Sequence, residues 1–172
     1  MQSISLGSSA TSVSRLAYGC WRILGPEGAV VDAGREAAGY KAVQVAYEAG
    51  FTFFDLADVY ADGAAERVFG RVLKETAGMR KGVVITTKCG IRRRGTPKPD
   101  SPYRYDFSAE YIVQCCEQSL QRLGLETIDV FQLHRPDYLM EPAEVVAAFA
   151  SAGLTDRLRL LDRGEALTLP FP

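Results

Sequence analysis

The chain is poor in the residues that build metal sites and disulfide frameworks. It has one histidine, one tryptophan and four cysteines, and no two cysteines form a CxxC pair. A structural zinc site needs four ligands drawn mostly from cysteine and histidine, so the sequence predicts no metal. Cysteines without a pairing pattern favour reduced thiols, which are typical of a cytoplasmic protein.

Charge of one sign and long apolar runs are lacking as well. Lys and Arg number 20 and Asp and Glu 21, a formal net charge of −1, so we expect no nucleic acid and no anionic membrane as partner. No apolar run approaches the roughly 18 residues that cross a bilayer. Residues 1–10 lack the basic region and apolar stretch of a secretory signal. With 172 residues, 47% of them apolar, the chain is long enough for one domain with a hydrophobic core.

Along the chain, short buried-strand patterns alternate with helical periodicity. The predicted strands are Leu16–Cys20, Phe51–Leu56, Gly82–Thr87 and Ile128–Leu133. The predicted helices begin near Ala38, Ala65, Ser108 and Val145, with Gly50 and Gly124 as stop signals for the first and third. Strands separated by helices indicate an α/β fold whose parallel strands are joined by right-handed crossovers.

Three segments lie outside this alternation. Ser3–Leu6 and the residues around Val13 are expected to form a small hairpin before the first strand. Gly90–Phe107 is predicted to be a long loop, and its Arg92–Arg94 run is more often a solvated face than an anion site. Residues 151–172 read as a divergent C-terminal tail, so we divide the chain into residues 1–150 and this tail.

Four proton-active side chains of different types follow the predicted strands. Asp55 ends the second strand, Tyr60 follows in the next loop, Lys88 ends the third strand and His134 follows the fourth. The carboxyl ends of parallel strands form one edge, where β/α folds place ligands and catalytic groups. Each of the four has an ordinary structural reading when taken alone, and it is their convergence on one edge that suggests a site.

A phenol, an amine, a carboxylate and an imidazole are suited to protonating a carbonyl oxygen. An ammonium stabilises a phenolate beside it, and a carboxylate holds that ammonium in place. A neutral imidazole donates one hydrogen bond and orients the substrate oxygen. Because no side chain supplies a hydride, the residues imply a nicotinamide cofactor.

Five segments, in order along the chain, resemble the motifs of the aldo-keto reductase family: Gly19–Trp21, Gly50–Tyr60, Ala65–Leu73, Ile85–Gly90 and Asp129–Asp137. The resemblance extends over roughly residues 1–149. It implies a (β/α)8 TIM-type barrel and the NADPH-dependent reduction of aldehydes or ketones to alcohols.

The resemblance also implies residue roles. Tyr60 becomes the general acid, Lys88 and Asp55 the pair that makes the phenol more acidic, and His134 the orienting donor. The residues implied to contact the cofactor are Cys20, Trp21, Asp55 and His134. Trp21 is also implied to form a wall of the substrate pocket, and the alternative for Trp21 is ordinary packing in the core.

This sequence departs from the family pattern in three places. Leu56 stands where Thr is common after the catalytic Asp, and Ala61 where Gly follows the catalytic Tyr. After the fourth predicted helix, Gly153–Arg157 replaces the family's next turn, and the second half of the barrel, with most of the cofactor contacts, is missing before Pro172. The expected fold is therefore an N-terminal half barrel of about four βα units after a short hairpin.

Half a barrel exposes two strand edges, which invite pairing with another chain. We therefore expect self-association, pairing with a missing C-terminal half, or a truncated product of marginal stability. Two functions stay open: a reductase that needs a complement, and a non-catalytic half-barrel fragment or interaction module that retains the site residues. A phosphate-binding β/α protein is a weaker third reading, because Gly25–Gly28 fits no glycine-rich phosphate motif.

Overall fold

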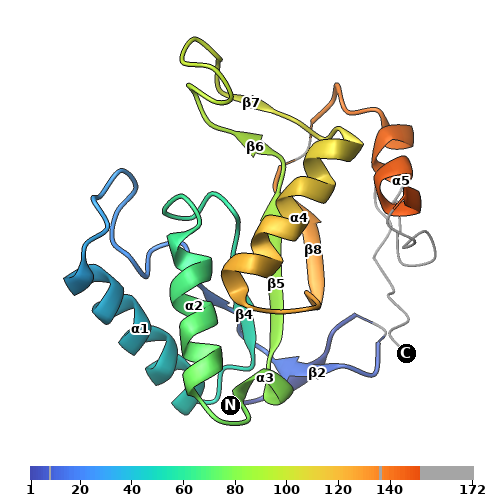
Figure 1. The fold of residues 1–172 in the computed structure, drawn as a ribbon. Helices are drawn as coiled ribbons and strands as arrows, with labels where there is room; N and C mark the ends of the chain where they lie inside the picture. The colour runs from blue at the N-terminus through green and yellow to red at the C-terminus, as the bar shows by residue number, and fades with distance from the viewer. Residues whose placement is uncertain (8, 136, 152–172) are drawn as a thin grey trace.

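A four-stranded parallel sheet forms the centre of the molecule (Figure 1). The computed structural model describes residues 1–7, 9–135 and 137–151. The sheet consists of β3 (Tyr18–Gly19), β4 (Phe53–Asp55), β5 (Val84–Cys89) and β8 (Val130–Leu133), hydrogen-bonded in the order β3-β4-β5-β8. Strand order therefore follows chain order, as the alternating pattern predicted.

Helices connect and cover these strands, so the predicted βα units are confirmed. They are α1 (Ala33–Glu48), α2 (Ala64–Glu75), the single turn α3 (Met79–Gly82), α4 (Ala109–Leu123) and α5 (Pro142–Ser151). In Figure 1, α1, α2, α4 and α5 follow one another around the sheet in chain order. Gly70 allows the close approach of α2 to α4, because a Cβ at this position would lie 2.6 Å from the Leu123 carbonyl oxygen.

Alternation along β5 assigns its side chains to two faces. On one face, Ile85, Thr87 and Cys89 are buried and meet the helices. On the other face, the Thr86 hydroxyl donates to the Gln132 side chain of β8. Lys88 belongs to this second face, so its ammonium is directed away from the helices and toward the end of the sheet.

The boundaries of several elements differ from the sequence predictions. Strand β3 is only two residues long, and α1 begins at Ala33, because the Asp32 side chain accepts a hydrogen bond from the Arg35 N–H and caps the helix. Gly124 ends α4 with φ 67°, as predicted. Ser108 is the N-cap of α4, but its side chain makes no capping bond and donates instead to Asp106.

The N-terminal hairpin is confirmed as β1 (Ser3–Ser5) paired antiparallel with β2 (Ser12–Ser14). Reciprocal hydrogen bonds between Ser14 and Thr52 fix it at the start of β4. Within the described residues, no helix is long and apolar enough to cross a membrane. The predicted tail lies outside the described residues from position 152 onward.

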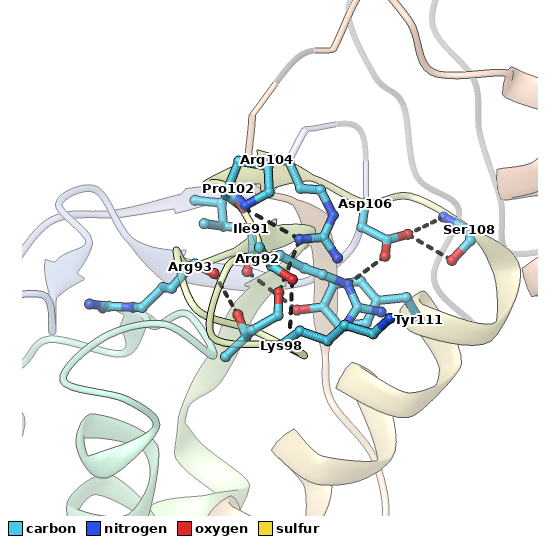
Figure 2. A network of polar contacts seen from close by, with 11 residues as sticks. Ile91, Arg92, Arg93, Lys98, Pro102, Arg104, Asp106, Ser108 and Tyr111 are labelled. Carbon is cyan, nitrogen blue, oxygen red and sulfur yellow. Dashed lines mark hydrogen bonds and ion pairs between the residues drawn. The ribbon is translucent and has the colours of Figure 1, made fainter.

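The predicted long loop contains a second small hairpin, β6 (Ile91–Arg92) with β7 (Arg104–Tyr105). The ion pair between Arg92 and Asp106 and the stacking of Arg92 over Tyr111, at 3.8 Å, join this hairpin to α4 (Figure 2). The long-loop prediction therefore missed this hairpin, and the reading of the arginine run as a solvated face was wrong for Arg92. The pattern was missed because each strand has only two residues, too few to produce a readable period.

Candidate active site

The four predicted proton-active residues lie at the carboxyl end of the sheet. Asp55 is the last residue of β4, Lys88 the fifth of β5, and His134 follows β8 directly. The backbone N–H of His134 donates to the Cys89 carbonyl at 2.8 Å, and this bond holds the histidine beside the end of β5. Tyr60 lies in the loop between β4 and α2, and its ring reaches the same edge.

The Lys88 ammonium is the centre of the site. Its Nζ lies 2.7 Å from the Asp55 Oδ1 and donates to the Leu56 carbonyl at 2.7 Å and to the Tyr60 hydroxyl at 3.2 Å. An ammonium has three N–H donors, and these three acceptors use all of them. The amine is therefore fixed in position and directs one donor at the phenolic oxygen.

His134 also packs against the Tyr60 ring. The two rings are 5.7 Å apart in an edge-on arrangement. Burial, together with the positive charges of Lys88 and Arg135, lowers the pKa of His134 to about 4, although the nearby Asp55 carboxylate acts in the opposite direction. Its Nδ1 is buried with no hydrogen-bond partner among the described residues. The imidazole is therefore neutral at pH 7 and carries a single N–H for donation.

We expect the imidazole of His134 to stay neutral between pH 8 and pH 5. It is the only histidine, so its ring signal in proton NMR needs no assignment by mutation. An unfolded imidazole binds a proton near pH 6.5 and the folded one near 4, so the unfolded state binds more protons between these values. Stability that His134 contributes is thus present above pH 6.5 and falls as the pH drops toward 4. A midpoint at or above 6.5 would contradict the neutral assignment.

Trp21 and Cys20 follow β3 but point in different directions. The Trp21 ring lies 6.4 Å from the Tyr60 ring, is 49% exposed and carries the Arg22 guanidinium 4.2 Å above it. The Cys20 side chain is fully buried in the core, and its thiol donates to the Tyr18 carbonyl. Burial raises the pKa of the Cys20 thiol far above its usual value. The structure thus brings Trp21 to the site but not the Cys20 thiol.

A cavity of about 400 Å³ adjoins the tyrosine loop. Its lining includes Trp21, Val31, Asp62, Arg67 and Arg93, so it has an aromatic wall, apolar surface and a few charged groups. This volume and this mixture are usual for small-molecule sites. The cavity lies beside the tyrosine loop at Ala61 and Asp62 and shares Trp21 with the site, while Tyr60, Lys88 and His134 are not among its lining residues.

The loop after Tyr60 has an unusual backbone. Ala61 and Asp62 adopt the left-handed conformation, with φ 48° and 53°. Aspartate tolerates this region, but for an alanine it costs roughly 1–2 kcal/mol. Arg93 bridges the loop, because its Nε lies 3.1 Å from the Asp62 Oδ1 and its Nη2 donates to the Val59 carbonyl. Sequence reasoning missed Arg93, since nothing in the arginine run marks which member turns toward Tyr60.

A buried carboxylate lies on the helix-facing side of the strand that carries Lys88. Glu66 is fully buried in α2 and accepts from the Thr87 hydroxyl and from the Arg122 Nε, both at 2.6 Å. Thr87 precedes Lys88 in β5, so Glu66 joins the helix after the tyrosine loop to the strand that carries the amine. One sequence signal could have identified Glu66, namely a charged residue on the apolar face of a helix.

The chain resembles known proteins in sequence and in fold. A model of the aldo/keto reductase family matches residues 15–154, most of the chain. The chain belongs to the aldo-keto reductase family. Its described elements are four βα units of the family's (β/α)8 barrel, as the sequence motifs implied.

Two curated relatives and one solved structure illustrate the extent of the match. A probable aldo-keto reductase 1 from Glycine max is 34% identical over 166 residues, covering 96% of this chain and 45% of the relative. A 6-dehydroglucose reductase from Novosphingobium aromaticivorans is 35% identical over 162 residues, covering 91% and 49%. A holo-form aldo-keto reductase from Bacillus halodurans superposes with a TM-score of 0.71 at 29% identity, covering 90% and 48%. The chain spans about half the length of these relatives.

Proposed function

We propose that the protein of which this chain is the N-terminal half barrel reduces aldehydes or ketones to alcohols with NADPH. The observation that carries the proposal is the ammonium of Lys88, which is paired with Asp55 and donates a hydrogen bond to the Tyr60 hydroxyl. This arrangement prepares a phenol to give up its proton, because the adjacent cation stabilises the phenolate that remains.

The proposed roles follow from which atoms can hold or move a proton. Tyr60 gives its hydroxyl proton to the carbonyl oxygen of the substrate. Lys88 holds the phenolate oxygen and Asp55 keeps the amine in place. His134, neutral and edge-on to the phenol, donates its single N–H to the same carbonyl oxygen and orients it. Trp21 forms one wall of the space that the substrate enters.

The donor set fits a nicotinamide cofactor. When bound, NADPH supplies the hydride that no side chain can provide. We propose that Trp21, Asp55 and His134 face the nicotinamide, since all three are partly exposed at the end of the sheet. Cys20 contributes through its backbone, because its thiol is in the core.

Pairing with a second half barrel is part of the proposal. β3 and β8 are the two edges of the described sheet, and a barrel needs both edges paired. We propose that the C-terminal half, or a second copy of this chain, supplies the strands that pair with them.

We place the protein in the cytoplasm, where reduced cysteines and a nicotinamide reductant are compatible. The competing function is a half-barrel interaction module without catalysis.

Fluorescence of Trp21 tests the proposal, because it is the only tryptophan and lies beside Tyr60. We expect added NADPH to quench this emission saturably, with N-acetyltryptophanamide as the control for absorption of the exciting light. Quenching that appears only after the C-terminal half is added supports the need for a complement. Absence of quenching at millimolar NADPH, with and without that half, favours the interaction module.

A further inference from the structure

We infer that Arg93 is a positioning residue that holds the phenol of Tyr60 against Lys88, an inference that rests on the proposed role of Tyr60 as proton donor. Arg93 reaches the tyrosine loop from the β6–β7 segment, 33 positions further along the chain. In Figure 2 its side chain extends away from the Arg92–Asp106 pair rather than joining the hairpin network. Its carbonyl accepts hydrogen bonds from Thr96 within the hairpin loop, while its side chain serves the tyrosine loop.

The contacts of Arg93 fall on both sides of Tyr60. Its Nη2 donates to the carbonyl of Val59, the residue before the tyrosine, and its Nε pairs with Asp62, two residues after it, at 3.1 Å. A planar guanidinium offers several N–H donors in a fixed fork, so one side chain contacts both ends of the four-residue turn from Val59 to Asp62. The tyrosine backbone is thereby held between two anchored points.

The turn needs such an anchor because of its backbone. Ala61 is left-handed at φ 48°, a conformation that costs an alanine free energy. The turn's own hydrogen bonds, from the Asp62 N–H to the Val59 carbonyl and from the Gly63 N–H to the Tyr60 carbonyl, hold it together with Arg93. Release of Ala61 would rotate the peptide that follows Tyr60 and carry the phenol away from the amine, now 3.2 Å distant. Arg93 therefore opposes local strain that the sequence places directly beside the proton donor.

The test follows the Tyr60 ring signal by NMR of the chain labelled with ¹³C-tyrosine, with the signal assigned by its loss in Tyr60→Phe. We expect Arg93→Met to move or broaden this signal by more than one linewidth. Arg94→Met is the matched control, since Arg94 is the next residue, exposed, and pairs with nothing in the described part of the chain. Signals from the core residues Tyr18 and Tyr47 report whether the fold is intact.

Two further variants separate positioning from charge. Adding Ala61→Gly to Arg93→Met is expected to restore at least half of the Tyr60 shift, because glycine adopts the left-handed conformation without steric cost. Arg93→Lys keeps the charge but not the planar fork, so we expect it to give an intermediate shift of the Tyr60 signal. This variant replaces Arg93→Met in the test if Arg93→Met does not fold. An unchanged Tyr60 signal in Arg93→Met, or a shift that Ala61→Gly leaves untouched, overturns the inference. The readout needs no turnover, so loss of the proposed function would be recognised separately, by Tyr60→Phe retaining activity.

Discussion

Replacing Tyr60 with phenylalanine is expected to reduce carbonyl turnover by about 100- to 10,000-fold, the range over which a positioned general acid accelerates a reaction. The substitution removes only the hydroxyl that accepts from Lys88. The ring stays, and with it the packing against Trp21 and His134. We therefore expect kcat to fall while the binding of NADPH, measured through Trp21, is retained.

The measurement is the rate of NADPH oxidation with a model aldehyde, by this chain joined to the half that completes the barrel. Tyr138→Phe is the matched control, because Tyr138 is 93% exposed and makes no contact with Lys88. Its turnover should equal that of the unmodified protein. Equal turnover of Tyr60→Phe would remove the phenol from the mechanism and leave His134 as the remaining donor.

Much of the fold was predictable because each strand–helix pair carries its own local signals. Phe54 and Ile85 lie in apolar runs too short for helices, and Gly124 marks a helix end that the structure places in the left-handed conformation. Parallel pairing followed from the alternation alone. The convergence of Asp55 and Lys88 was predictable for the same reason, since both lie at the carboxyl ends of neighbouring parallel strands.

What was not predictable depends on side-chain direction between segments distant in sequence. Arg92, Arg93 and Arg94 are chemically identical, yet the first pairs with Asp106 and the second with Asp62. No periodicity distinguishes them, because the choice depends on where the hairpin lies over the tyrosine loop. The burial of the Cys20 thiol was likewise missed, since a strand of two residues gives no alternation to read.

Loss of the Glu66 carboxylate is expected to destabilise the fold strongly. In Glu66→Ala, the Arg122 guanidinium loses the carboxylate at 2.6 Å and the buried Thr87 hydroxyl loses its acceptor. Removing one partner of a buried ion pair costs about 3–5 kcal/mol, because the other charge stays desolvated. For a chain of this size, that loss corresponds to a decrease in the melting temperature of roughly 10 °C.

Urea unfolding followed by far-ultraviolet circular dichroism measures the change, and the same helix provides the control. Glu75 pairs with Arg71 at 3.9 Å with both side chains about half exposed, so Glu75→Ala should cost less than about 1 kcal/mol. If Glu66→Ala does not fold, Glu66→Gln keeps an acceptor for Thr87 and removes only the charge, which still predicts a lower unfolding midpoint than Glu75→Ala. Equal midpoints for the Glu66 and Glu75 variants would mean that the buried network contributes no more than a surface pair. The link from α2 to the strand carrying Lys88 would then have to come from apolar packing, in which Ile85 of β5 shares one buried cluster with Phe69 and Val72 of α2.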